Sequence, residues 1–271
     1  MSGRFEVTFL GTNGSCAYNS GSRTKYGTNT PCVAVMAGEE TLIFDTGSGV
    51  CGFPGLPGYQ RERVRIFYSH YHIDHFSGLL FLPHLFDRQK RFDLYGGNGG
   101  SVSLDQVVDR FLGRPLHPVG IENFAARLDF HTVMAEQIIP LSGGVTVRTH
   151  RLSHPGAALG YRVEYGGKSF CYCTDVELSA HRDDDDLLRF TQNADLLVLD
   201  SFFDDGKVEP GWGHSSWREC AQWAKRARVK KMALFHYGFS LHDAEIDAME
   251  SKARKIFPNT FAAADRMRVE L

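Results

Sequence analysis

The chain has 271 residues, of which 42% are hydrophobic and 23% charged, with a formal net charge of −2. This composition is typical of a globular protein with enough apolar residues for a rigid core. No long run of Lys or Arg is present, so we expect no long nucleic-acid partner. No apolar run approaches the ~20 residues of a membrane helix, and residues 1–6 lack a signal-peptide core. We therefore expect a cytoplasmic protein with no membrane partner.

The first part of the chain is predicted to form three strands and a long loop. Residues 4–10 alternate in polarity as a strand does, and residues 15–30 form a loop rich in Gly, Ser and Asn, of the kind that often carries function. Residues 32–36 and 41–44 then predict a hairpin. Its second strand ends in Asp45 beside a tight glycine turn. Such a carboxylate suits a supporting role, because a metal-bound His usually donates its other N–H to one.

The densest functional signal follows a predicted buried strand at residues 64–68. It contains His70, His72, Asp74 and His75 within six positions. Neutral imidazole is the commonest protein metal ligand, and zinc and similar ions bind both His nitrogen and Asp oxygen. Alternation puts the first two histidines on one side of an extended chain, and the turn after them faces the other two residues toward a second point. This loop can therefore serve two adjacent metal ions.

The rest of the chain is predicted to alternate strands with helices. Residues 79–86, 103–112 and 244–257 are expected to be helical, and a further helix follows Ser216. Strands are expected over residues 92–95, 128–133, 138–141, 145–149, 159–163, 169–173, 196–199 and 230–235, and residues 261–271 close the fold. The order of these elements suggests two similar halves, each of strands and helices.

Three residues with metal-binding side chains each follow a predicted strand in the second half. They are His154, Asp175 and His236. His150 competes with the first of them. His242 competes with the last but is the weaker candidate, because it leads directly into a predicted helix.

A second pair of polar residues stands beside the start of a predicted helix. Asp200 ends the buried strand 196–199, and His214 lies just before Ser216 and Glu219, which have the spacing of a capping box. The cap fixes His214 close to the helix N-terminus.

The stretch from His70 to His75 resembles the signature of the metallo-β-lactamase fold, and the resemblance continues along nearly the whole chain. It implies an α/β (α+β) four-layer αβ/βα sandwich, here as one domain over residues 1–271. It also implies two divalent metal ions, with zinc expected and manganese or iron open. The implied ligands are His70, His72 and His154 for the first metal, Asp74, His75 and His236 for the second, and Asp175 between them, with Asp45 in support.

The resemblance implies hydrolysis. Redox diiron members of the fold tend to have a carboxylate at the position of His72, so a histidine at this position favours hydrolysis. The Gly213-His214-Ser215 stretch resembles the His-Ser loop of tRNase Z and its phosphodiesterase relatives. By that resemblance His214 is the general acid, Asp200 orients it, and Asp74 helps to orient the attacking hydroxide. The alkoxide leaving group of a phosphodiester needs such a proton.

The substrate expectation rests on one departure from tRNase Z, which carries a long arm between its third His and its bridging Asp. Here His154 and Asp175 are only 21 positions apart. We therefore expect a phosphodiesterase acting on a small phosphodiester or cyclic nucleotide. A thioester or lactone hydrolase and a non-catalytic diiron sensor are the alternatives. Relatives are often dimers, which makes a homodimer a candidate assembly.

Overall fold

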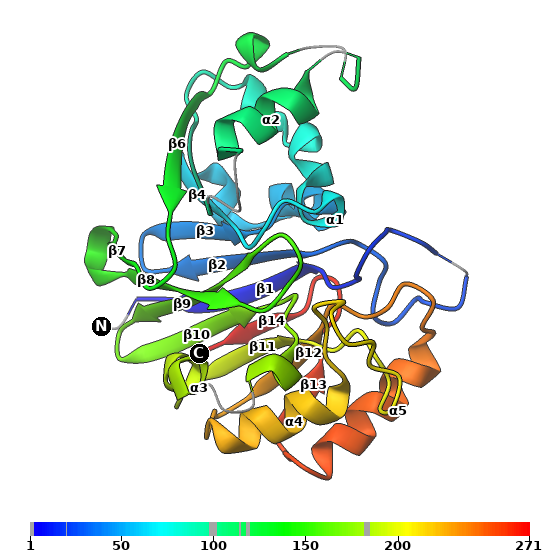
Figure 1. Ribbon diagram of the computed structural model, residues 1–271. Helices are drawn as coiled ribbons and strands as arrows, with labels where there is room; N and C mark the ends of the chain where they lie inside the picture. Colours follow the sequence, from blue (N-terminus) through cyan, green and yellow to red (C-terminus); the bar gives the residue numbers. More distant parts are fainter. Residues whose placement is uncertain (1–2, 20, 98–101, 114, 118–119, 182–184) are drawn as a thin grey trace.

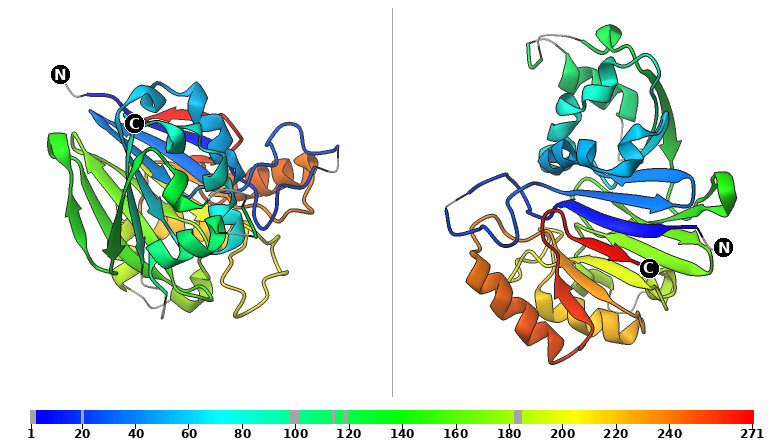
Figure 2. Two further views of the ribbon diagram at one scale, coloured as in Figure 1. Left: turned by 90° about the horizontal axis from the view of Figure 1, so that it is seen from above. Right: turned by 180° about the vertical axis from the view of Figure 1, so that it is seen from behind.

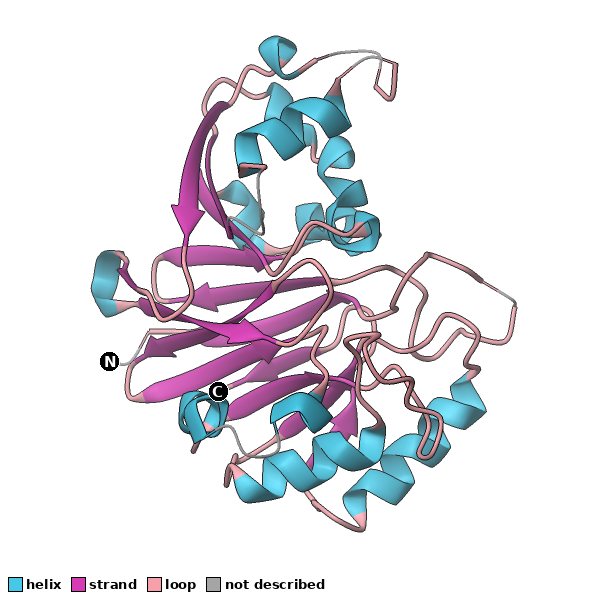
Figure 3. Cartoon of the chain, in the orientation of Figure 1, coloured by secondary structure: helices cyan, strands magenta, loops and turns pink. Residues whose placement is uncertain are grey.

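The computed structural model describes residues 3–19, 21–97, 102–113, 115–117, 120–181 and 185–271, and these form two seven-stranded sheets packed face to face. Helices cover the outer surfaces of both sheets (Figure 1, Figure 3). The predicted four-layer sandwich of strands and helices is confirmed. Within these residues, no helix is both long and apolar enough to cross a bilayer.

The first sheet places the Asp45 turn and the histidine-rich loop at the same edge. Its strands, in order, are β14 (Arg268–Glu270), β1 (Phe5–Gly11), β2 (Cys32–Ala37), β3 (Glu40–Phe44), β4 (Arg63–Tyr68), β5 (Arg91–Gly97) and β6 (Arg127–Val133). Strands β3 to β6 are parallel. Because Phe44 pairs with Phe67 in this register, the chain leaves β3 and β4 side by side.

The second sheet places the candidate residues from the later part of the chain at one edge. Its strands, in order, are β13 (Thr260–Ala262), β12 (Met232–Phe235), β11 (Leu196–Asp200), β10 (Lys168–Cys173), β9 (Ala158–Tyr165), β8 (Thr146–Leu152) and β7 (Ile138–Pro140). Strands β10 to β13 are parallel, with Cys173 paired to Leu199 and Asp200 to Phe235. Asp175, Asp200 and His236 therefore emerge at one edge.

Aromatic side chains fill the space between the two sheets. The ring of Phe44 lies 5.5–5.8 Å from the rings of Phe67, Tyr161, Phe170 and Tyr172. All five residues are fully buried. Burying one such side chain stabilises the fold by about 1.5–3 kcal/mol, so this layer holds the sheets at a defined separation.

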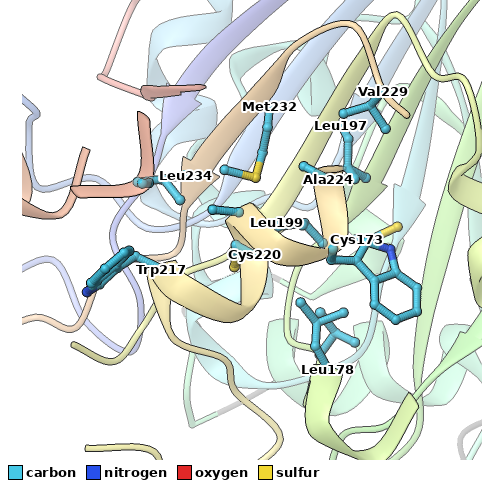
Figure 4. Close-up of a cluster of buried hydrophobic side chains, with 14 of the residues drawn as sticks. Cys173, Leu178, Leu197, Leu199, Trp217, Cys220, Ala224, Val229, Met232 and Leu234 are labelled. Carbon is cyan, nitrogen blue, oxygen red and sulfur yellow. The ribbon is translucent and has the colours of Figure 1, made fainter. Parts of the chain in front are cut away.

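The helices over the second sheet pack through small residues. Helix α4 (Trp217–Arg226) lays Cys220 and Ala224 against Leu199 and Met232 of the strands beneath it (Figure 4). These small side chains let the helix approach the sheet closely. The capping box expected at its start is confirmed, with the Glu219 N–H donating to Ser216 Oγ and the Ser216 N–H to the Glu219 carboxylate.

The segment after the histidine-rich loop differs from the expected helix over residues 79–86. These residues fall in two 3-10 helices separated at Leu82, because Pro83 lacks an N–H and disfavours helical backbone at the residue before it. The remaining α-helices are α1 (Ile73–Phe76), α2 (Leu104–Leu112), α3 (Asp185–Thr191) and α5 (Asp243–Arg254). The 3-10 helices are η1 (Ser48–Gly55), η2 (Pro57–Gln60), η3 (Ser77–Phe81), η4 (Pro83–Phe86), η5 (Ile121–Asn123), η6 (Ser142–Gly144) and η7 (Leu178–His181).

The loop that follows β1 projects beside α5 (Figure 2). The Asp243 carboxylate accepts hydrogen bonds from the N–H groups of Thr24 and Lys25, and Arg23 donates to the carbonyls of Gly238 and Leu241. The loop is therefore fastened at the start of α5, close to the edge where His236 emerges.

Candidate metal centre

The predicted ligands converge where the strand ends of the two sheets meet. His70, His72 and His154 form one group, and in each group one ligand atom per residue lies within 4.8 Å of the others. Asp74, His75 and His236 form a second group. Every one of these residues follows a strand or begins the helix α1, and so they reach the site from both sheets.

Asp175 lies between the two groups. Its Oδ1 is 3.9 Å from His70 Nε2 and 3.8 Å from His154 Nε2. Its Oδ2 is 3.2 Å from His75 Nε2 and 3.4 Å from His236 Nε2. One carboxylate oxygen therefore faces each group, which is the placement of a ligand shared by two ions.

The distances within each group fit a metal ion. The His72 and His154 nitrogens are 3.2 Å apart, and the Nε2 atoms of His75 and His236 are 3.3 Å apart. Two nitrogens bound at about 2.0–2.1 Å to one tetrahedral ion lie roughly 3.3 Å from each other. His70 Nε2 is buried without a hydrogen-bond partner in the described part of the chain. These residues fit two divalent metal ions.

The protonation states also suit metal binding. Burial lowers the pKa of His70, His72 and His154, which keeps their nitrogen lone pairs free. Burial alone would raise the pKa of Asp74 and Asp175, but the neighbouring imidazoles outweigh it and lower both pKa values. The first group therefore offers neutral nitrogen donors, whereas in the second group Asp175, Asp74 and Asp45 outweigh burial and raise the pKa of His75.

Asp45 is the supporting carboxylate of the second group. It is fully buried, and its Oδ2 accepts the Nδ1–H of His75 at 2.8 Å, which leaves His75 Nε2 facing the site. The N–H and hydroxyl of Ser69 also donate to this carboxylate, at 2.7 and 2.8 Å. The Tyr172 hydroxyl donates at 2.9 Å from the opposite sheet. The orientation of His75 is therefore fixed from both sides.

Asp200 and His214 form a close pair next to the second group. The Nδ1–H of His214 donates to Asp200 Oδ2 at 2.6 Å, and the ring stacks on Phe202 at 4.6 Å and on His236 at 5.2 Å. Burial lowers the pKa of His214, but the Asp200 carboxylate outweighs burial and raises this pKa to about 9. His214 is thus held as a protonated imidazole at neutral pH.

The competing histidines lie outside these groups. His150 pairs with Glu136 at 2.6 Å and stacks on Phe190. His242 occupies the N-cap of α5. Neither appears in any metal-ligand group of the residues that the structure describes.

Three contributors were missed by the reasoning from sequence. Ser69 and Tyr172 anchor Asp45, and the N–H of Ser15 donates to Asp74 Oδ2 at 2.9 Å. Ser69 could have been suspected, because it separates the strand from the histidine motif. Tyr172 had no signal, since its partner is 127 positions away.

Comparisons with known proteins point to one superfamily. A model described as the beta-lactamase superfamily domain matches residues 41–237. Ribonuclease Z of Picrophilus torridus is 26% identical over 310 residues, covering 98% of this chain and 96% of the relative. Ribonuclease Z of Thermoplasma acidophilum is 25% identical over 329 residues, covering 100% and 98%.

Solved structures share the fold. The metallo-beta-lactamase fold protein YhfI from Bacillus subtilis superimposes with a TM-score of 0.74 at 19% identity, covering 99% of this chain and 100% of that one. Human tRNase Z, short form, superimposes with a TM-score of 0.68 at 22% identity, covering 97% and 98%.

These relatives correct one expectation from the sequence. The prediction of no long nucleic-acid partner is wrong, because the curated relatives that align along nearly the whole chain are ribonucleases. The prediction relied on the formal net charge of −2. Net charge averages over the whole surface, whereas a phosphate group responds to the local field, which in such a site includes the charge of the ions themselves.

Proposed function

The chain belongs to the beta-lactamase superfamily and is a hydrolase, and from this premise we propose that it cleaves phosphodiester bonds with a two-metal centre. The observation that carries the proposal is the Asp200–His214 pair, 2.6 Å apart, beside the two ligand groups. A carboxylate-oriented imidazolium next to metal ligands suits a reaction whose leaving group must be protonated.

The ligand assignment in this proposal follows the geometry. His70, His72 and His154 would hold one ion, Asp74, His75 and His236 the other, and Asp175 both. Zinc suits this set of nitrogen and oxygen donors, and manganese or iron are open. Two such ions would lower the pKa of the attacking water and offset negative charge on the phosphoryl oxygens.

Two residues would then move or direct protons. His214 would donate from its imidazolium to the leaving oxygen, and Asp200 would hold the ring through Nδ1 so that Nε2 faces the substrate. Asp74 Oδ2 lies 3.4 Å from the Nε2 atoms of both His75 and His236 and also accepts the Ser15 N–H. This fixed carboxylate would orient the attacking hydroxide as well as bind metal.

We propose RNA as the first substrate class, because ribonuclease Z relatives align over the chain at 24–26% identity. A small phosphodiester is a second candidate, favoured by one observation. Strands β9 and β10, which lie between His154 and Asp175, are joined by a tight turn at Gly166 and Gly167, with no additional element. The substrate would then be held chiefly at the site itself.

The test is turnover by the purified protein after chelation and return of zinc, manganese or iron. The substrates are a short RNA with a 3′ extension, a cyclic nucleotide and bis(p-nitrophenyl) phosphate, with a thioester and a lactone beside them. Metal-restored cleavage of any diester, lost in His214→Ala for the RNA, supports the proposal. Turnover of the thioester or lactone alone would refute it, as would no turnover of any substrate by protein that has bound two ions.

A further inference from the structure

The turn that follows Asp175 contacts the segment that carries His214. This turn contains Glu177, whose Oε2 accepts hydrogen bonds from the N–H groups of Gly211 at 2.8 Å and Gly213 at 3.3 Å. We propose that Glu177 is a positioning residue that fixes His214 for phosphodiester cleavage, through a segment that also contacts His154. The inference rests on the proposed function and adds a residue outside the ligand set and the acid pair.

The segment that Glu177 holds has little structure of its own. Residues 204–215 form no helix or strand. Gly211 and Gly213 have φ angles of +84° and +79°, in a region that favours glycine. Segments with few internal hydrogen bonds open at low free-energy cost, so their geometry depends on partners outside them. The Glu177 carboxylate is such a partner, and it accepts from both glycines at once.

Gly213 connects the Glu177 contact to His154 and His214. Its carbonyl accepts the Nδ1–H of His154 at 2.9 Å, so that His154 Nε2 faces the first ligand group. A side chain at Gly213 would collide with the same imidazole. The next residue along the chain is His214. A single residue, Gly213, thus contacts Glu177 through its N–H and the proposed metal ligand His154 through its carbonyl.

The turn has other anchors that do not involve the carboxylate. The Glu177 N–H donates to the Ser153 carbonyl at 3.0 Å. Ser215 Oγ donates to the Val176 carbonyl at 2.6 Å and accepts the Leu178 N–H at 3.0 Å. Removing only the carboxylate leaves these bonds in place, and we therefore expect Glu177→Ala to fold.

Glu177→Gln is the conservative partner of this variant. A Gln carbonyl oxygen can accept from Gly211 and Gly213, while its amide can donate to the Ser179 hydroxyl, which now donates to Glu177 Oε1 at 3.1 Å. Glu209→Ala is the matched control, since Glu209 is an exposed Glu of the same segment. Its carbonyl accepts the Trp212 N–H, and the substitution keeps that carbonyl.

The experiment compares two leaving groups with the metal-loaded enzyme. p-Nitrophenolate departs without a proton, whereas the alkoxide leaving group of a dinucleoside monophosphate needs one. For Glu177→Ala we expect kcat on the dinucleotide to fall about 10- to 100-fold, and on bis(p-nitrophenyl) phosphate by less than about 3-fold. Glu177→Gln and Glu209→Ala should stay within about 3-fold on both. Equal losses on the two substrates, no loss, or no recovery in Glu177→Gln would overturn the inference.

A second measurement separates this inference from the proposed function. Hydrogen exchange of the Gly211 and Gly213 amides should accelerate in Glu177→Ala and stay slow in Glu177→Gln and Glu209→Ala. If the wild type cleaves neither diester, the proposed function fails while the exchange rates still report on the positioning contact. Unchanged exchange in Glu177→Ala would refute that contact whatever the activity.

Discussion

Asp200→Asn gives the sharpest test of how the acid pair works. The substitution is isosteric, and its side-chain oxygen can still accept the Phe202 N–H that Asp200 Oδ1 accepts at 2.9 Å. It removes the negative charge 2.6 Å from His214 Nδ1, which is the influence that raises the pKa of His214 to about 9. Without that charge, burial lowers the pKa against the smaller influence of Asp175 and Asp74, and we expect the pKa of His214 to fall toward the ordinary value of 6.5.

The size of the effect follows from this difference in pKa. At pH 8 an imidazole of pKa about 9 is about 90% protonated, whereas one of pKa 6.5 is about 3% protonated, a ratio of roughly 30. The variant should therefore lose about 30-fold in kcat at pH 8 on a substrate with an alkoxide leaving group. The loss should shrink below pH 6, where both forms of the enzyme carry the proton.

The assay is the pH profile of kcat for wild type and variant on a dinucleoside monophosphate, with metal content matched. The alkaline limb should move to lower pH in Asp200→Asn, whereas the profile for bis(p-nitrophenyl) phosphate should change little. Identical alkaline limbs in the two proteins would refute the role of Asp200. An equal loss at every pH would instead show that the carboxylate acts only through packing.

The other predictions concern metal affinity, stability and cooperativity. Asp45→Asn should weaken metal binding about 10- to 100-fold by chelator competition, because an amide has one acceptor oxygen, whereas the carboxylate accepts the Ser69 N–H on one oxygen and the His75 N–H on the other; unchanged affinity would remove Asp45 from the site. Burial raises the pKa of Asp265 to about 6, so its contribution to the free energy of unfolding is present at low pH and is lost as pH rises through 6. Between pH 5 and pH 8, the free energy of unfolding measured in urea should fall by about 1 kcal/mol more in the wild type than in Asp265→Asn. The same pH dependence of this free energy in both proteins would contradict the prediction. Because β14 pairs with β1, residues 1–271 should unfold as one domain in a single transition, which two separated transitions by circular dichroism would disprove.

Part of the fold could be read from local sequence. The strand before His70 and the capping box at Ser216 depend on neighbouring residues only, and both are observed where they were expected. The helix over residues 79–86 was misjudged, because its apolar spacing competes with a proline that breaks it into 3-10 turns. The apolar spacing carries no information about the free-energy cost of a proline within a helix.

In the site, too, some contacts follow from local sequence and others only from the packing of the two sheets. His70, His72, Asp74 and His75 come from one loop, so their proximity follows from chain geometry. The Tyr172 hydroxyl reaches Asp45 across 127 positions, which only the packing of the two sheets brings about. The prediction of no long nucleic-acid partner failed for a related reason, since net charge carries no information about where charges lie.

The aromatic layer between the sheets has a consequence for the metal centre. The first sheet supplies His70, His72, Asp74 and His75, and the second supplies the remaining ligands. Each ligand group contains residues from both sheets, so the distance across each group depends on the thickness of the core behind it, where Phe44 contacts rings from both sheets. A substitution that changes the side-chain volume at Phe44 would change the spacing of the two sheets. It would alter the distance between the ligands that the two sheets contribute to each group, and with it the preference of each group for one metal radius over another, without changing a ligand.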